Sequence, residues 1–507
     1  MTAAWCMALL ILAPLTTAAL AVVIPRRGRG LAFVTAVVVG AAVTGLFREL
    51  RDHGVRIHQV GGWGAPLGID LRVDGLALLM LCVTAGIGIA VALYATRYFA
   101  SNLNLGQNRP QEPKDEATHR DYYFWPIFLF LWTALNALFL SADIFNLYVT
   151  LELLGFAAVT LVALAGGPAA LSAALRYLTV SLSASLFYLL GVGLVFGQCG
   201  TVDLPSLAAQ RESGPALWVA LGLMTGGLIT KAALFPMHFW LPPAHANAPA
   251  PVSALLSALV VKGPFYILLR LWFEAFPTLL TPAVTQGFGV LGAGAILWGS
   301  IQALRQQRLK LLVAYSTVAQ LGYLFLLLPL CSNSGGGGMA WSGALMLLGA
   351  HACAKAAMFL AAGNILHVTG HDRIQGLDGF ARSLPMSAFA FGLAGLSLVG
   401  LPPSGGFAGK WLLLNAALTQ GQWWWVAILL IGGLLAAAYV ARVLTHAFTH
   451  LDGEATVRHA LPRIMEWTPL GLALLAVLLG FASDGAARLL EVGAPALAQA
   501  AKGRMEP

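Results

Sequence analysis

The chain has 507 residues and a formal net charge of +8; 59% of its residues are hydrophobic and only 10% are charged. Soluble domains carry about 25% charged residues, so this composition excludes an ordinary soluble enzyme and indicates one membrane domain. The basic residues occupy the short segments that connect the apolar runs, which we call joints. This pattern is typical of membrane topology and argues against nucleic-acid binding.

Apolar runs long enough to cross a bilayer recur along the chain, since a spanning helix needs about 20 mostly apolar residues. The first run has no basic lead-in and no clear cleavage site, so we interpret it as a retained span rather than a signal peptide. We therefore expect an all-α integral membrane protein with about 14 transmembrane helices. The expected spans are residues 3–24, 30–47, 75–97, 123–142, 144–166, 171–197, 215–241, 252–272, 284–304, 309–330, 339–366, 385–418, 423–446 and 467–490.

Two of these spans contain prolines that should break the helix. The span 215–241 is interrupted by Pro236, and the span 385–418 contains Pro402 and Pro403 and is too long for one straight helix. Broken helices occur in membranes where other parts of the protein, or water, satisfy the freed backbone groups. We expect both spans to consist of two helical pieces.

The joints also predict the orientation of the chain. Lys and Arg are more frequent in the odd-numbered joints, which predicts that those joints are cytoplasmic and that both termini are periplasmic. The most polar stretch, residues 101–121, is interpreted as a solvated cytoplasmic loop. The predicted location is a bacterial inner membrane, which the chain crosses many times.

Five ionisable residues lie deep inside apolar spans, where each costs at least about 2.5–3.5 kcal/mol on insertion scales. Such groups usually face a bundle interior, a partner or water. A buried lysine loses affinity for its proton, whereas a nearby carboxylate favours the charged lysine, so a lysine–glutamate pair can be tuned by its separation. The alternative is a set of buried ion pairs that only fix helix packing. The five residues are Glu152, Lys231, Lys262, Lys355 and Lys410.

Two histidines extend this set. His238 follows Lys231 by seven residues, close to two helical turns, although Pro236 intervenes. His351 and Lys355 are four residues apart, which places them together on one helix face. Histidine titrates near neutral pH and suits a proton relay. The alternative is a histidine that only satisfies a backbone carbonyl at a helix break.

Other titratable groups are expected near the membrane surface. Lys310 begins its span, so its side chain should extend to the interface. The remaining residues of this kind are interpreted as solvated histidines or interfacial arginines: His245, His367, His371, Arg176 and Arg270.

Several motifs resemble one family. The run KAALFPMHFWLP from Lys231, continued by AHANAPAPVSALLSALVVKGPFYILLR, resembles a signature of the proton-translocating membrane subunits shared by respiratory complex I, energy-converting hydrogenases and Mrp antiporters. DIFNLYVTLE from Asp143 resembles the family's fifth helix, YSTVAQLGY its tenth, HACAKAAMFLAAGNI its eleventh and GLPPSGGFAGKWLLL its broken twelfth. DIFNLYVTLELLGF and KAALFP resemble the D-type membrane component of Mrp antiporters, whereas HFWLPPAHANAPAPVSALL is closer to complex I and hydrogenase-4-type subunits.

The resemblance implies a fold with two inverted five-helix repeats, helices 4–8 and 9–13, in which helices 7 and 12 are broken. The implied division is an N-terminal part at 1–122, repeats at 123–272 and 273–450, and a C-terminal helix and tail at 451–507. It also implies a proton path in which Glu152 pairs with Lys231 and Lys410 is the terminal site. The implied path is Glu152, Lys231, His238, Lys262, His351, Lys355 and Lys410.

The function implied is proton translocation, with Na⁺ as a second candidate ion, by a subunit that works with other membrane subunits of one complex. The sequence has no nucleotide-binding loop, flavin signature or cysteine cluster, so we expect no cofactor, no metal and no catalytic redox site in this chain. Two alternatives remain: a quinone-interacting redox subunit, and a partner of an energised bicarbonate-uptake complex.

Overall fold

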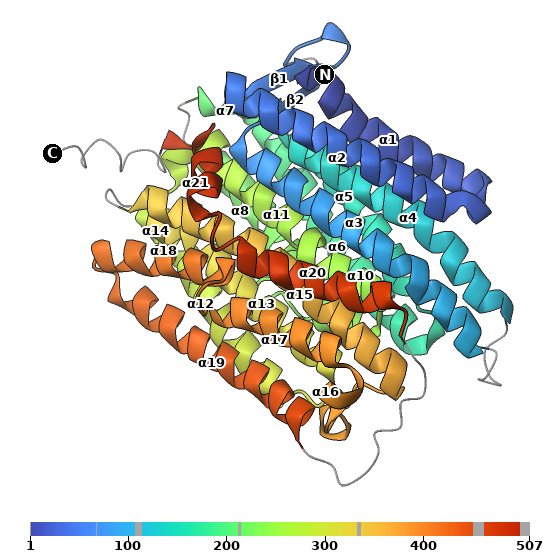
Figure 1. The fold of residues 1–507 in the computed structure, drawn as a ribbon. Coiled ribbons are helices and arrows are strands. Elements are labelled where there is room, and N and C mark those ends of the chain that lie inside the picture. Colours follow the sequence, from blue (N-terminus) through green and yellow to red (C-terminus); the bar gives the residue numbers. More distant parts are fainter. Residues whose placement is uncertain are drawn as a thin grey trace.

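The computed structural model describes residues 2–66, 68–106, 114–210, 214–331, 336–449 and 461–496. Long helices run side by side across most of the molecule (Figure 1). Within the described residues, 11 helical segments are long and apolar enough to cross a membrane, and two shorter apolar helices accompany them. The prediction of a multi-pass, all-α membrane protein is therefore confirmed.

The N-terminal part consists of three long helices and a small β-hairpin. The strands β1 and β2 pair in antiparallel register, with Arg56 opposite Val73. They lie beside the start of α1, and we call this side of the molecule the hairpin end (Figure 1). The elements are α1 (Ala3–Val23), η1 (Pro25–Arg27), α2 (Gly28–His53), β1 (Arg56–Gln59), η2 (Val60–Gly62), β2 (Asp70–Val73) and α3 (Gly75–Gly106).

The next block contains the first broken helix and a helix with two π-helical turns. Its elements are α4 (Lys114–Leu140), α5 (Ile144–Ala163), α6 (Gly167–Cys199), α7 (Leu204–Ala208), α8 (Pro215–Lys231) and α9 (Leu241–Asn247). One continuous span follows, built from α10 (Ala250–Leu255), η3 (Leu256–Val260), α11 (Lys262–Leu269) and η4 (Arg270–Ala275).

The second block contains the second broken helix and is followed by two C-terminal helices. Its elements are η5 (Pro277–Leu279), α12 (Pro282–Arg305), α13 (Leu309–Phe325), α14 (Leu327–Cys331), α15 (Gly337–Thr369), η6 (Ile374–Gly376), α16 (Phe380–Ser383), α17 (Pro385–Val399), α18 (Gly405–Thr419) and α19 (Trp423–Phe448). The chain then forms α20 (Arg463–Leu478) and α21 (Ser483–Glu491).

Both predicted breaks are present. In the first, α8 ends at Lys231 and the chain passes through turns, with Ala233 at a φ of 53°, before α9 begins at Leu241. In the second, α17 ends at Val399 and Gly400 adopts a φ of 88°, a left-handed conformation that glycine tolerates without strain. Ser404 then caps α18 by accepting a hydrogen bond from the Phe407 amide at 3.1 Å.

Other expected boundaries differ from the structure. The expected last span, 467–490, is divided between α20 and α21. The expected polar loop 101–121 is largely helical, because α3 and α4 extend into it, and its residues 107–113 lie outside the described part. The inverted relation of the two blocks and the four-part division remain predictions.

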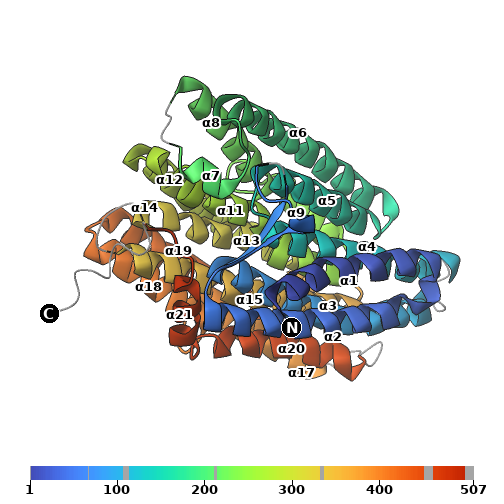
Figure 2. The ribbon, with the colours of Figure 1, turned by 90° about the horizontal axis from the view of Figure 1, so that it is seen from above.

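The core lies where two spans are surrounded on all sides. The most apolar window of α15, and that of the span 250–275, are each 100% buried, whereas the corresponding windows of α1, α2, α6 and α19 are 39% buried. Helix α15 packs against α10, α13, α17, α18 and α20. Seen from above, α15 lies inside the bundle, and α6 and α1 lie on its outer sides (Figure 2). A polar group on these two spans is therefore shielded from lipid.

Candidate functional site

The first break carries an ion pair. The Lys231 ammonium, at the last residue of α8, lies 3.1 Å from Oε2 of Glu152 on α5. The Ser185 hydroxyl, from α6, donates to the same carboxylate oxygen. A Cβ added at Gly155 would lie 3.0 Å from the Ser181 hydroxyl of α6, so the glycine allows α5 and α6 to pack closely beside the pair. The predicted pair therefore forms, and a third helix holds its carboxylate.

His238 lies in the connection between α8 and α9. Its ring stacks against Phe235 at 5.7 Å between centroids and meets the edge of Tyr315, on α13, at 6.3 Å. Its Nδ1 is buried without a hydrogen-bond partner among the described residues. The histidine thus extends from the first break towards the second block.

Lys262 occupies the middle of the buried span and is fully shielded from solvent. It begins α11 directly after the π-helical turn η3, and its ammonium donates to the carbonyl of Ser257 within that turn. The Ser257 hydroxyl in turn hydrogen-bonds Thr317 of α13 at 2.8 Å. Because π-helical turns interrupt the regular backbone pattern, they recur at functional sites. Here the turn supplies a backbone carbonyl as the hydrogen-bond acceptor for the lysine.

The predicted neighbours on α15 face α13. The Lys355 ammonium donates to the carbonyl of Val313 at 3.0 Å and to the Ser316 hydroxyl. Both ring nitrogens of His351 are buried without a hydrogen-bond partner among the described residues. The charges of Lys262, Lys355 and Lys410 all act on this ring. On α15, His351 lies one helical turn before Lys355, so the two side chains share one helix face.

Lys410 is held by the second break. Its ammonium, from α18, donates to the carbonyls of Leu398 at 2.7 Å and Val399 at 3.3 Å, the last two residues of α17. It also lies 4.2 Å from the centre of the Tyr323 ring. A helix C-terminus carries partial negative charge, and an aromatic face attracts cations. Both features stabilise the ammonium without a carboxylate.

Two surface assignments from the sequence are wrong and enlarge the site. His245 is fully buried, and its ring packs against Phe359 of α15. Lys310 is also buried, and its ammonium donates to the carbonyl of Ala248. The reason is that α9 turns into the bundle and packs on α13 instead of continuing to the surface. The signal available in the sequence was the seven-residue spacing of His245 from His238 within one motif.

These two residues connect to the predicted set. The charges of Lys310, Lys262 and Lys355 act on the His245 ring. The negative charge of Asp372 acts on Lys310. Asp372 lies in the loop after α15 and pairs at 3.0 Å with Arg308, the residue that precedes α13. His245 and Lys310 thus form a side branch from the central lysines towards the loop after α15.

A third surface assignment, that of Arg270, is also wrong, because its side chain is only 3% exposed and pairs with acidic residues at the hairpin end. Arg176 and His371 are exposed, as expected.

Within the described ranges no group of three His, Cys, Asp or Glu residues could hold a metal ion. The chemistry that the buried groups offer is proton binding and hydrogen bonding by amines, imidazoles, hydroxyls and one carboxylate.

Comparisons with known proteins agree with this arrangement. The family model described as NADH:quinone oxidoreductase/Mrp antiporter, transmembrane, matches residues 141–436. NADH-quinone oxidoreductase subunit N of Desulforudis audaxviator is 36% identical over 428 residues, which cover 83% of this chain and 81% of that protein. The D-type component of the Na(+)/H(+) antiporter of Alkalihalophilus pseudofirmus is 27% identical over 463 residues, 88% of this chain and 89% of that protein. A chain in the Mrp complex of Dietzia sp. DQ12-45-1b has a TM-score of 0.85 at 25% identity, with 99% of this chain and 100% of that chain covered.

Proposed function

Because the chain belongs to the NADH:quinone oxidoreductase/Mrp antiporter family, we propose that it moves protons through a bilayer along its buried lysines and histidines. The proposed order is Glu152, Lys231, His238, Lys262, His351, Lys355 and Lys410. It is an antiporter-like membrane subunit, and its structural neighbours stand in multisubunit membrane complexes. Other membrane subunits are therefore its proposed partners.

The observation that carries the proposal is that four lysines, each on a different helix, are buried on the inner faces of the bundle. All four are at most 9% exposed, and each donates to an oxygen acceptor. Hydroxyls of Ser257, Thr317 and Ser316 lie between them. A group that binds and releases protons needs such acceptors, because a bare buried ammonium is too costly.

The Glu152–Lys231 pair is the proposed point of control. A carboxylate 3.1 Å away stabilises the ammonium form, and a longer separation weakens this effect. The pair is at the edge of the path, where the Glu152 side chain is 16% exposed. A neighbouring subunit that moves α5 would change the distance between Glu152 and Lys231. This would change the proton affinity of Lys231 and start proton transfer along the proposed path.

We place the Lys310–His245 branch as a second access route to the central lysines. It begins beside the Arg308–Asp372 pair, where the Arg308 side chain is 42% exposed, and reaches the His245 ring, on which the charges of Lys262 and Lys355 act.

The chain is proposed to lie in a bacterial inner membrane with both termini periplasmic. The start of α1 and helix α21 both lie at the hairpin end, which supports termini on one side (Figure 1).

The test is reconstitution of the native complex into liposomes that contain a pH-sensitive dye, with H⁺, Na⁺ or K⁺ gradients imposed in turn. Lys262→Arg keeps a positive charge at the centre of the path but cannot release its proton, since a guanidinium stays protonated in proteins. We expect its proton flux to fall by about tenfold or more, the factor that corresponds to about 1.4 kcal/mol of barrier.

The matched control is Arg176→Lys on the exposed face of α6, which should leave the flux unchanged. Full flux in Lys262→Arg would remove that residue from the path. Proton movement that depends on added quinone or bicarbonate, rather than on a cation gradient, would favour one of the two alternative functions.

A further inference from the structure

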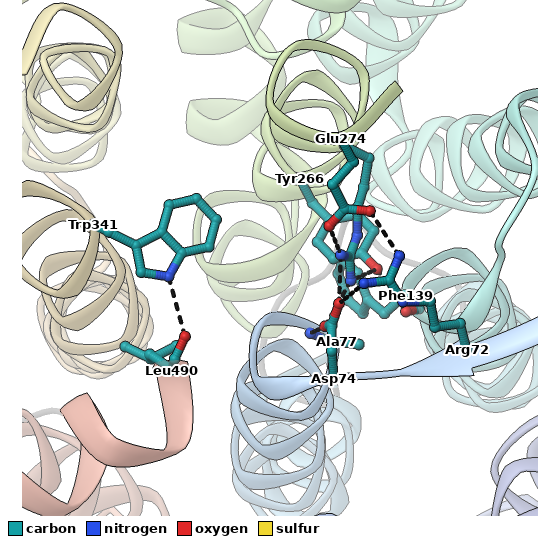
Figure 3. Close-up of polar contacts among 9 residues, drawn as sticks. Arg72, Asp74, Ala77, Phe139, Tyr266, Glu274, Trp341 and Leu490 are labelled. Carbon is teal, nitrogen blue, oxygen red and sulfur yellow. Dashed lines mark hydrogen bonds and ion pairs between the residues drawn. The ribbon is translucent and has the colours of Figure 1, made fainter. Parts of the chain in front are cut away.

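A second buried ionic cluster lies at the hairpin end, outside the row of lysines described above. It consists of Arg72, Asp74, Tyr266, Arg270 and Glu274, which we call the hairpin-end cluster (Figure 3). It joins the strand β2 to α11 and η4, two parts of the chain separated by about two hundred residues.

The contacts within the cluster are dense. Arg270 makes two parallel hydrogen bonds to Asp74, at 2.6 and 2.8 Å, and also pairs with Glu274. Arg72 bridges the same two carboxylates, at 3.0 Å to Asp74 and 2.9 Å to Glu274. The cluster therefore holds two positive and two negative charges and is neutral as a whole.

A hydroxyl group connects the cluster to the inner part of the same span. The Tyr266 hydroxyl accepts a hydrogen bond from Arg270 at 2.9 Å and donates one to the carbonyl of Phe139 at 2.7 Å (Figure 3). Lys262, Tyr266, Arg270 and Glu274 are spaced four residues apart, so they follow one another along one side of the helical span.

Exposure increases along this stripe: Lys262 is fully buried, the Arg270 side chain is 3% exposed and the Glu274 side chain is 13% exposed. Their partners from the hairpin follow the same order, with the Asp74 side chain 1% exposed and that of Arg72 18% exposed. The C-terminal segment lies beside Asp74, because the amide of the next residue, Gly75, donates to the carbonyl of Val492 at 2.8 Å. The stripe thus leads from the central lysine to solvent at Glu274 and Arg72.

We propose that the hairpin-end cluster is an electrostatic gate between Lys262 and the aqueous phase at the hairpin end, a role that rests on the proposed function. The guanidinium of Arg270 cannot release its proton, so it acts as a fixed positive charge that opposes the passage of another proton. Its two carboxylates cancel this barrier. A proton that binds to Glu274 is passed inward through water while Asp74 still neutralises Arg270: the Tyr266 hydroxyl takes up one proton as it turns from the Phe139 carbonyl and releases its own proton to water on the inner side.

The gate predicts that the sign of the cluster's net charge controls the proton flux. Glu274→Gln removes a negative charge, leaves the cluster net positive and should lower the flux. Arg72→Gln removes a positive charge, leaves it net negative and should raise the flux or keep it at the wild-type level. We expect changes of about three- to tenfold, which correspond to about 0.7–1.4 kcal/mol of barrier height.

These two variants form a matched pair, because both break the same 2.9 Å contact between Arg72 and Glu274. A cluster that only fastens the hairpin to the bundle would respond to both in the same direction. Equal losses of flux and of melting temperature, or no change in either variant, would overturn the gate. In the double variant Arg72→Gln/Glu274→Gln, the neutral cluster should restore the flux towards the wild-type value.

A third variant tests the hydroxyl. Tyr266→Phe keeps the ring and its packing on Phe139, which it meets at 5.1 Å, but removes the group between Arg270 and the inner span. The flux should fall, whereas Tyr94→Phe, which removes an equally buried hydroxyl that donates to Asn364 at 2.9 Å, should retain it. Flux as high in Tyr266→Phe as in Tyr94→Phe would exclude the hydroxyl from the route.

The same liposomes separate failure of the gate from failure of the proposed function. If the wild-type complex moves no protons, or if Lys262→Arg moves them fully, the proposed function itself fails. If the flux depends on Lys262 but Glu274→Gln and Arg72→Gln do not differ, only the gate is wrong. Melting temperature and co-purification of the complex, measured for each variant, show which losses come from misfolding.

Discussion

The two helix breaks hold the same type of side chain in opposite ways. At the first break, Lys231 is bound by a full negative charge on another helix, Glu152 of α5. At the second, Lys410 of α18 is bound by two carbonyls at the end of α17, the other piece of the same broken helix, and by the face of the Tyr323 ring. A charged partner on a separate helix can approach or withdraw, whereas the end of a helix supplies a constant partial charge. The first lysine is therefore suited to control and the second to constant binding.

Of the changes at the two helix breaks, removal of the negative charge at the first break should have the largest effect. Glu152→Gln keeps one side-chain oxygen that can accept from Lys231 and Ser185 but abolishes the negative charge that stabilises the ammonium. Proton flux in liposomes should fall by about tenfold. The control is Glu49→Gln on α2, since the Glu49 side chain is similarly shielded, at 20% exposed, and pairs with Arg56 away from the path. Equal fluxes in the two variants would remove the control role from Glu152.

At the second break, Lys410→Arg separates charge from proton release. Arginine keeps the positive charge and can donate to the carbonyls of Leu398 and Val399, but it does not release its proton. We expect a folded complex whose flux is reduced about as strongly as in Lys410→Met, which loses both functions. A flux in Lys410→Arg near the wild-type level would mean that Lys410 only holds the end of α17.

The helix caps in the two blocks also differ, and they predict a smaller effect on stability. Asp143 caps α5 by accepting from the Asn146 amide at 2.5 Å, and Ser404 caps α18 by accepting from the Phe407 amide at 3.1 Å. Replacement of either cap by alanine should destabilise the protein by about 1 kcal/mol. Thermal unfolding of the purified complex at several pH values measures both changes.

Only the Asp143 cap should respond to pH. Burial raises the pKa of Asp143, and the charges of Asp203 and Asp70 add to this against the backbone hydrogen bonds from Asn146 and Phe145. A carboxyl group with a raised pKa contributes stability below the ordinary aspartate pKa of about 3.9, and this contribution is lost as the pH rises through the folded-state value. Asp143→Asn, which is also a good cap, should therefore raise the melting temperature at pH 7 but not at pH 4. A gain at the lower pH alone would contradict this.

The smallest effect concerns the aromatic partner at the second break. The Tyr323 hydroxyl is buried without a hydrogen-bond partner among the described residues, so Tyr323→Phe loses little and keeps the ring beneath Lys410. Its melting temperature and flux should stay near those of the wild type. Tyr323→Leu removes the cation–π contact, which is worth about 0.5–2 kcal/mol, and should be measurably less stable. Equal stability of the two variants would show that the ring only fills space.

The path residues could be recognised in the sequence because an ionisable group inside an apolar run is costly and therefore conspicuous. Lys262, Lys355 and Lys410 stand out in this way, and the structure buries all three. His245, Lys310 and Arg270 were misplaced because each lies near the end of an apolar run. The same sequence pattern describes a side chain that reaches water and one that is covered by a neighbouring helix.

The membrane class, the two helix breaks and the family follow from the amino-acid sequence, because they depend on apolar run length, on proline and on contiguous motifs. Helix packing, in contrast, selects the acceptor that holds each lysine: Glu152 for Lys231, a π-turn carbonyl for Lys262 and the end of α17 for Lys410. It also brings Arg270 to Asp74 of a remote hairpin. Most of these partners are far apart in the chain, and the packing of helices determines which of them come within hydrogen-bond distance.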